Sequence, residues 1–140
     1  MNGKIRWGII GLGGIAKKFA SDLSYVENAE LVAVGSRNLG KAKSFAAEFS
    51  VPAFYGNYES LAADKNVDVI YIATPHSHHH ENTLLCLNNN KAVLCEKAFA
   101  VNSRQAIEMI NLAKEKKIFL MEELWTKFIP QYKRLMEILK

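Results

Sequence analysis

A short glycine-rich turn near the start of the chain constrains its fold more than any other feature of the sequence. Residues 11–16 read Gly-Leu-Gly-Gly-Ile-Ala, which matches the pattern G-x-G-x-x-G/A of dinucleotide-binding turns. The turn follows the apolar run Ile5 to Ile10, which predicts a strand, and it precedes a predicted helix over 15–23. This placement between a strand and a helix predicts that amides at the helix start hold phosphate.

Each small residue of such a turn has its own task. Gly11 allows the tight turn, Gly13 lets the backbone approach a pyrophosphate, and Ala16 permits close packing of the helix on the strand. A P-loop would instead require G-x-x-x-x-G-K-[ST], and residues 16–18 read Ala-Lys-Lys, without the second glycine and without the hydroxyl. We therefore expect cofactor contacts from the whole turn, that is from Gly11, Leu12, Gly13, Gly14, Ile15 and Ala16.

Beyond the turn, short β-branched runs alternate with longer stretches of helical period, which is the pattern of βαβ units. The fold class is α/β, with a Rossmann-type doubly wound parallel sheet of about six strands and helices on both faces. In the first helix Ile15, Phe19 and Leu23 recur every four residues and should face the sheet. The near-continuous apolar run over 67–73 predicts a strand buried on both faces. We expect strands at 5–10, 31–35, 54–55, 67–73, 92–95 and 118–121, and helices at 15–23, 39–49, 58–63, 79–87, 103–116 and 130–140.

The regular alternation breaks near 122–129. We therefore expect a dinucleotide-binding Rossmann domain over 1–122 and, over 123–140, a connector and a first helix that lead to a C-terminal substrate domain, which the chain does not contain. A chain of 140 residues is long enough to bury the core of one domain.

Composition excludes several other classes of protein. Lys and Arg exceed Asp and Glu by 18 to 14 without forming runs, which disfavours a nucleic-acid partner. No apolar run approaches the roughly 20 residues that cross a bilayer, and the start lacks a signal-peptide pattern. We expect a cytoplasmic protein without a membrane partner, in which Cys86 and Cys95 are reduced core thiols.

The end of the second predicted strand indicates which cofactor binds. In NAD-preferring sites a carboxylate about 20 residues past the glycine motif binds the ribose 2′-hydroxyl. Here the strand ends in Ser36, Arg37 and Asn38, with Lys41 one helical turn further on. A guanidinium can grip a 2′-phosphate and stack on adenine, whereas a carboxylate would repel it. We expect NADP rather than NAD, bound by Ser36, Arg37 and Lys41, and disfavour an S-adenosylmethionine site; the alternative is that Arg37 is a solvated loop residue.

Four histidines gather at 76, 78, 79 and 80, as in some zinc sites. They lie at a predicted strand-to-helix turn and lack further ligands at a recognisable spacing. We therefore expect no metal.

Several motifs occur in order along the chain, and together they resemble one known family. They are Gly11 to Ala16, Ser36-Arg37, Ala73-Thr74-Pro75 followed by His79, Cys95-Glu96-Lys97, Met121-Glu122, and Trp125 to Phe128 with Pro130. Over essentially its whole length the chain resembles the glucose-fructose oxidoreductase/inositol dehydrogenase/MocA-type oxidoreductases, most closely their dihydrodiol dehydrogenase-like branch.

The resemblance implies roles for particular residues. Lys97 would be catalytic, hydrogen-bonding the substrate oxygen while hydride moves to or from nicotinamide C4, and Glu96 would contact the nicotinamide ribose. Trp125 would shield hydride transfer from water, and its alternative role is packing between domains. The cofactor-binding residues implied in this half of the site are Ala73, Thr74, Pro75, His76, His79, Glu96, Lys97, Trp125 and Lys127. The sequence departs from the family at Ala98, which stands where proline is common, at His76, where Asn is usual, and at Lys127, where close relatives carry Arg.

The resemblance also implies an activity. We expect an NADP-dependent oxidoreductase that acts on CH-OH or CH-CH groups and transfers hydride between NADP(H) and a carbinol or carbonyl of a sugar or cyclic diol. The substrate domain would also form the oligomer interface, so the full-length protein is expected to be a homo-oligomer and this fragment alone inactive. The alternative is a stand-alone nucleotide-binding or redox-sensing module without catalysis, which would not need Lys97 beside nicotinamide C4.

Overall fold

A six-stranded, wholly parallel sheet forms the centre of the molecule, in the order β3-β2-β1-β4-β5-β6. The computed structural model describes residues 3–139. The strands are β1 (Ile5–Ile10), β2 (Ala29–Gly35), β3 (Ala53–Tyr55), β4 (Val69–Ile72), β5 (Ala92–Cys95) and β6 (Leu120–Glu122). The α-helices are α1 (Gly14–Leu23), α2 (Leu39–Phe49), α3 (Tyr58–Ala62), α4 (His79–Asn88), α5 (Ser103–Lys116) and α6 (Pro130–Ile138). Two short 3₁₀ helices, η1 (His76–His78) and η2 (Trp125–Phe128), were not predicted.

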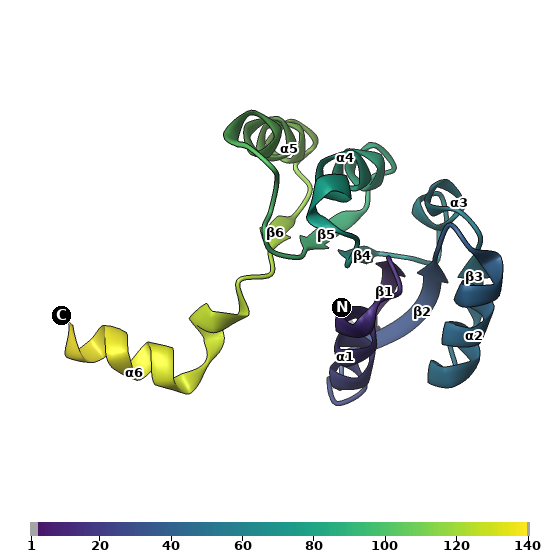
Figure 1. Ribbon diagram of the computed structural model, residues 1–140, viewed down its shortest axis with the longest axis horizontal. Coiled ribbons are helices and arrows are strands. Elements are labelled where there is room, and N and C mark those ends of the chain that lie inside the picture. The colour runs from purple at the N-terminus through teal and green to yellow at the C-terminus, as the bar shows by residue number, and fades with distance from the viewer. Residues whose placement is uncertain (1–2, 140) are drawn as a thin grey trace.

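Helices cover both faces of the sheet, which confirms the predicted α/β doubly wound fold. Helices α1 and α2 lie on one side, and α3, α4 and α5 lie on the other (Figure 1). The chain runs outward from β1 to β3 and then returns to place β4 beside β1. Crossovers leave the sheet in opposite directions at this point, so a crevice opens at the carboxyl ends of β1 and β4.

The centre of the sheet confirms the expectation for the fourth strand. Strand β4 lies between β1 and β5, and its residues Ile70, Tyr71 and Ile72 are buried. Both cysteines are buried and free, as predicted.

The predicted inward face of the first helix was right at Leu23 and wrong at Ile15. The side chain of Ile15 is 49% exposed, whereas Ala16, Ala20 and Leu23 are buried. Alanine has no long side chain to hold the helix away from the strands, so the helix axis approaches the sheet along the alanine stripe. Phe19 lies at the side of this contact and stacks on Tyr71, with 3.9 Å between the ring centroids.

Some strands begin or end at other residues than predicted, because pairing with the neighbouring strand, and not composition, determines where a strand begins. Strand β6 begins at Leu120 instead of residue 118, because Leu120 is the residue that pairs with Val93 of the short strand β5. The amide of Ile118 instead donates to the Ala113 carbonyl and closes the end of α5. At the other end of α5 the Asn102 side chain caps the helix by accepting from the Gln105 amide at 3.0 Å, as the capping pattern Asn102-x-x-Gln105 in the sequence predicts.

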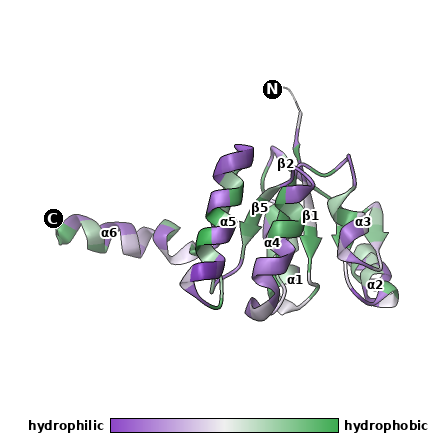
Figure 2. Cartoon of the chain, turned by 90° about the horizontal axis from the view of Figure 1, so that it is seen from above, coloured by the Kyte–Doolittle hydropathy of each residue, from purple (hydrophilic) through white to green (hydrophobic). Residues whose placement is uncertain are grey.

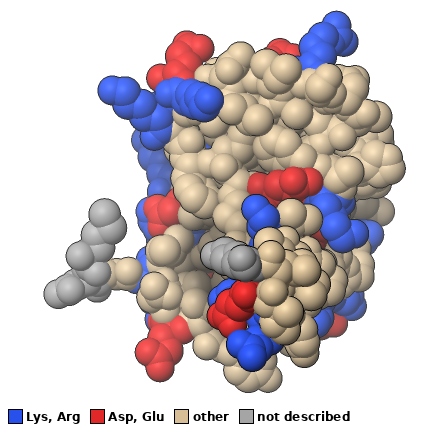
Figure 3. Space-filling model, turned by 90° about the vertical axis from the view of Figure 1, so that its left-hand side faces the viewer, with Lys and Arg blue, Asp and Glu red and all other residues tan. Residues whose placement is uncertain are grey.

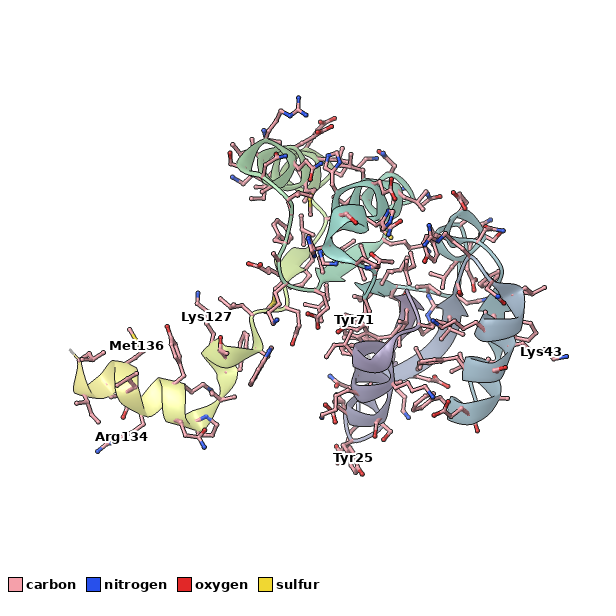
Figure 4. The ribbon with its side chains drawn as sticks, viewed as in Figure 1. Tyr25, Lys43, Tyr71, Lys127, Arg134 and Met136 are labelled. Atoms are coloured by element: carbon pink, nitrogen blue, oxygen red, sulfur yellow. The ribbon has the colours of Figure 1, made fainter. Side chains whose placement is uncertain are left out.

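The last segment of the chain stands away from the sheet. Helix α6 has no buried residue and carries exposed Leu135, Met136 and Ile138, and hydrophobic and hydrophilic residues alternate along it (Figure 2). Lys127 and Met136 project from this segment rather than toward the sheet (Figure 4). Among residues 3–139 no helix is long and apolar enough to span a bilayer. Acidic and basic side chains are interspersed on the face drawn in Figure 3.

Candidate cofactor and active site

The turn after β1 depends on glycine at its first position. Gly11 has φ +86°, in the left-handed region that favours glycine. A Cβ on Gly11 would lie 2.7 Å from the backbone N of Thr74 and 2.8 Å from the carbonyl carbon of Ala73. Gly11 therefore lets the turn after β1 lie directly against the chain that leaves β4.

The next two glycines have a different environment. A Cβ on Gly13 or Gly14 would meet no heavy atom within 4 Å, so nothing inside the protein requires glycine at these positions. Helix α1 starts here, with Gly13 as its N-cap, no side-chain cap and no acidic residue in its first turn. The first amides of a helix lack partners within the helix, so the start of α1 offers N–H donors to an anion.

The crevice predicted by the topology contains a cavity of about 650 Å³. Its walls come from the turn after β1, the end of β2 with the start of α2, the start of α3, and the segment after β4. The residues that line it are Gly11, Leu12, Gly13, Ser36, Arg37, Asn38, Lys41, Tyr58, Ala73, Thr74 and Pro75. The structure thus brings together most of the residues predicted for the phosphate and adenosine half of a dinucleotide site. The lining includes two cations and no carboxylate.

The end of β2 is held rigidly beneath the exposed cation. Ser36 is buried, its amide donates to the Tyr55 carbonyl at 3.1 Å, and its hydroxyl accepts from the Asn38 amide at 3.2 Å. Asn38 in turn caps α2 by accepting from the amide of Lys41 at 3.0 Å. Arg37, between these two fixed residues, is exposed.

Sequence reasoning missed Tyr58, which belongs to the same site. Tyr58 and Arg37 line both this cavity and a second one of about 320 Å³ beside it, toward η1 and α4. Burial raises the pKa of the Tyr58 hydroxyl, and Arg37 opposes the rise by its charge and a hydrogen bond. The Asn57-Tyr58 dipeptide is a helix start by its capping pattern, but only the fold brings it to the end of β2.

The segment after β4 is anchored from below. Thr74 is buried, and its Oγ1 accepts a hydrogen bond from Nδ2 of the buried Asn82 at 3.1 Å. Thr74 and Pro75 line both cavities. His76 begins η1 and is exposed outside these two cavities.

At the end of β5 one carboxylate organises the Glu96-Lys97 pair. Glu96 is buried, its Oε1 accepts from the Tyr71 hydroxyl at 2.6 Å, and its Oε2 accepts from the Lys97 amide at 3.1 Å. Burial and the bond to Glu96 raise the pKa of Tyr71 well above its usual value. The Lys97 side chain is exposed, and the Lys97–Ala98 peptide is cis.

A third, largely apolar cavity of about 410 Å³ lies between α1 and the segment after β6. Figure 4 shows Tyr71 between α1 and the strands. Burial, and then the charge of Glu96, raise the pKa of Glu123. The residues that line this cavity are Ile15, Lys18, Phe19, Asp22, Tyr71, Glu96, Glu123 and Trp125. It therefore unites three residues expected near the cofactor, Ile15 of α1, Glu96 directly after β5 and Trp125 of η2.

The remaining predicted residues lie apart from these walls. Ala16 is buried on the side of α1 that packs against the sheet, Gly14 is the first residue of that helix, and Lys127 is exposed in η2. His79 is 1% exposed and contacts the protein backbone through both ring nitrogens.

The histidine cluster does not converge. His78 pairs with Glu81, and His80 pairs with Glu108 across to α5. Within residues 3–139 no group of three or more His, Cys, Asp or Glu side chains could hold a metal ion.

Known proteins are similar to this chain in both sequence and fold. The chain is 46% identical over 137 residues to trans-1,2-dihydrobenzene-1,2-diol dehydrogenase from Mus musculus. It is 43% identical over 147 residues to D-xylose 1-dehydrogenase (NADP(+)) from Hypocrea jecorina. Each match covers 96% of this chain, but only 41% and 38% of these relatives, so the chain spans about two fifths of their length.

A solved structure extends the likeness to three dimensions. A 3-ketoreductase from Actinomadura kijaniata, in complex with NADP and TDP-benzene, superimposes with a TM-score of 0.92 at 30% identity, over 97% of this chain and 42% of that one. Residues 5–124 match the sequence profile of the oxidoreductase family with an NAD-binding Rossmann fold. The chain therefore belongs to this family, the Gfo/Idh/MocA oxidoreductases, and contains its dinucleotide-binding domain.

Proposed function

We propose that this chain binds NADP(H) and supplies the cofactor half of an NADP-dependent oxidoreductase. The observation that carries the proposal is the cavity at the carboxyl ends of β1, β2 and β4. It joins an uncapped helix start to two cations, Arg37 and Lys41, and no carboxylate is among its lining residues. Both phosphate groups of NADP thus find donors or positive charge in one cavity.

The residues of the cavity fit the parts of NADP in a definite way. The amides at the start of α1 suit the pyrophosphate, and the free space at Gly13 and Gly14 lets it approach the backbone. Arg37 and Lys41 suit the 2′-phosphate, because charge-assisted hydrogen bonds to phosphate are strong and directional for a guanidinium. An NAD-selective site would need a carboxylate where Ser36 and Arg37 stand.

The end of β5 supports the catalytic half of the proposal. The nicotinamide of a bound cofactor gives or takes hydride at C4. Lys97 presents an exposed ammonium at the carboxyl edge of the sheet, where it would donate a hydrogen bond to the substrate oxygen and stabilise its developing charge. Glu96 accepts hydrogen bonds from the Lys97 amide through Oε2 and from the Tyr71 hydroxyl through Oε1. We therefore propose that Glu96 positions Lys97, in addition to any contact with the ribose.

The substrate class is proposed from the relatives. One is named for a dihydrodiol and another for D-xylose. We propose a cyclic diol or a sugar as substrate, with hydride leaving or entering at a carbinol or carbonyl carbon. The chain spans only about two fifths of these relatives, so we propose that the selecting residues, the acid or base that works with Lys97, and an oligomer interface lie in a substrate domain outside the matched region. Residues 123–139, with the exposed apolar face of α6, would be the connection to it.

Calorimetric titration of the chain with NADPH and NADH tests the proposal. We expect tighter binding of NADPH and a loss of about 10- to 100-fold in NADPH affinity for Arg37→Ala, the scale of a charged hydrogen bond, with NADH affinity little changed. Lys41→Ala should lower the affinity for NADPH and leave the affinity for NADH unchanged. Lys43→Ala serves as a matched control. Lys43 is exposed on the same helix but projects away from the cavity (Figure 4).

Two results would contradict the proposal. Equal affinities for NADPH and NADH in the unaltered chain would refute the assignment of the 2′-phosphate. Equal losses in the Lys41 and Lys43 variants would show that only net charge matters.

A further inference from the structure

Helix α4 begins with a buried histidine whose hydrogen bonds restrict its chemical form. His79 Nε2 lies 2.8 Å from the carbonyl oxygen of Thr74, and Nδ1 lies 2.8 Å from the carbonyl oxygen of Ala98. A backbone carbonyl only accepts hydrogen bonds. Both contacts are hydrogen bonds only when each ring nitrogen carries a proton. With one proton, a ring lone pair would face a carbonyl lone pair in a site that is 1% exposed.

The two carbonyls belong to the two segments that matter most for the site. Thr74 leaves β4 and lines both cavities near Arg37. Ala98 directly follows Lys97 after β5. A single side chain thus joins segments that are 24 residues apart in sequence, as Thr74 and Ala98 are.

The charges around this link are accounted for. On the Lys97 segment, the Phe99 amide donates to Glu122 Oε1 at 3.0 Å, which places a carboxylate on the peptide next to Ala98. On α4, Glu81 lies in the first turn and contacts His78 Nδ1 at 2.6 Å, so its negative charge is shared between that ring and the start of the helix. The neighbouring His80 is occupied elsewhere, by Glu108 at 2.9 Å.

We propose that His79, carrying a proton on both ring nitrogens, is the positioning residue that holds the Lys97 segment against the Thr74 segment. This assigns it a role other than direct contact with the cofactor, since the protein backbone takes both of its ring nitrogens. The link between segments stands on the hydrogen bonds alone. Its importance for catalysis rests on the proposed function, because it positions the lysine that would meet the substrate.

Nitrogen NMR of the ¹⁵N-labelled chain tests the link without any substitution. Two protonated ring nitrogens give similar chemical shifts, whereas a ring with one proton gives two widely separated ones. We expect similar shifts for the two ring nitrogens of His79. Widely separated shifts would overturn the proposal.

Amide hydrogen exchange then tests the positioning role. In His79→Gln we expect the Lys97 and Phe99 amides to exchange about tenfold faster, the scale of one lost hydrogen bond to a charged donor, after normalisation to the Ile70 amide in the core. The matched control is His80→Gln, one residue along the same helix. Equal exchange in the two variants would overturn the proposal. A failure to bind NADPH would refute the proposed function and leave these two readouts unchanged.

Discussion

Replacing Gly11 by alanine should destabilise the whole domain by an amount that the turn geometry sets. An L-residue at φ +86° costs about 1–2 kcal/mol. The added Cβ would lie 2.7 Å from the Thr74 backbone nitrogen, and backbone cannot rotate away as a side chain could. Overpacking of this kind costs about 1–3 kcal/mol. We therefore expect a loss of about 2–5 kcal/mol, against a total of about 5–15 kcal/mol for an ordinary domain.

Urea unfolding of the chain, followed by circular dichroism, measures this loss. We expect a lower midpoint at an unchanged slope, because the surface exposed on unfolding stays the same. Gly13→Ala is the matched control. Gly13 has φ −96°, and a Cβ added there would meet no heavy atom within 4 Å. The free energy of unfolding of the Gly13→Ala chain should therefore stay within about 0.5 kcal/mol of that of the original chain.

The two variants should separate folding from binding. Gly13→Ala should lower the affinity for NADPH, since the added methyl group would lie where the pyrophosphate approaches the backbone. A Gly11→Ala chain as stable as the original, within about 0.5 kcal/mol, would refute the steric reasoning. So would a Gly13→Ala chain that unfolds as easily as Gly11→Ala.

Three further substitutions test other contacts. Asp68→Asn removes the carboxylate that Arg6 binds through Nε and Nη2. Both side chains are exposed to solvent, which screens the pair, so urea unfolding should show only a small loss of stability. Because the hydrogen bond from Arg6 lowers the pKa of Asp68, this difference should be present above the usual carboxyl range and vanish in more acidic solution. Burial, and then the charge of Glu96, raise the pKa of Glu123. The protonated carboxyl therefore contributes stability at low pH, and this contribution is lost as pH rises through the raised pKa. Glu123→Gln should remove that pH dependence, measured by thermal unfolding. Asn102→Ala removes the cap of α5 and should cost about 1 kcal/mol in urea unfolding.

Local patterns predicted the order and type of the main elements because their causes are local. The glycine turn, the cap at Asn102 and the uninterrupted apolar strand β4 each act within a few residues of themselves. The inward face of α1 was predicted correctly at Leu23 but not at Ile15, because periodicity marks Ile15 as apolar, while close approach of the helix to the sheet buries the alanines instead.

The site was predicted less completely, since part of it is made by contacts between distant segments. Tyr58 gives no cofactor-binding signal in sequence and reaches the cavity only because α3 follows β3 at the end of the sheet. The carbonyl partners of His79 lie in two loops, so its contacts could not be read from the histidine cluster. The links of Glu96 to Tyr71 and to the Lys97 amide likewise depend on how β4 and β5 pair.

The parallel sheet also governs when a binding site can exist during synthesis. The residues that line the cavity in the crevice follow β1, β2, β3 and β4, so the chain must be made as far as Pro75 before all of them are present. Strand β4 then has to insert beside β1, a pairing between residues about sixty positions apart. A nascent chain ending before β4 would carry the glycine turn without the wall formed by Thr74 and Pro75. Nucleotide binding thus selects molecules whose sheet is already assembled, and it should protect the whole domain rather than one loop.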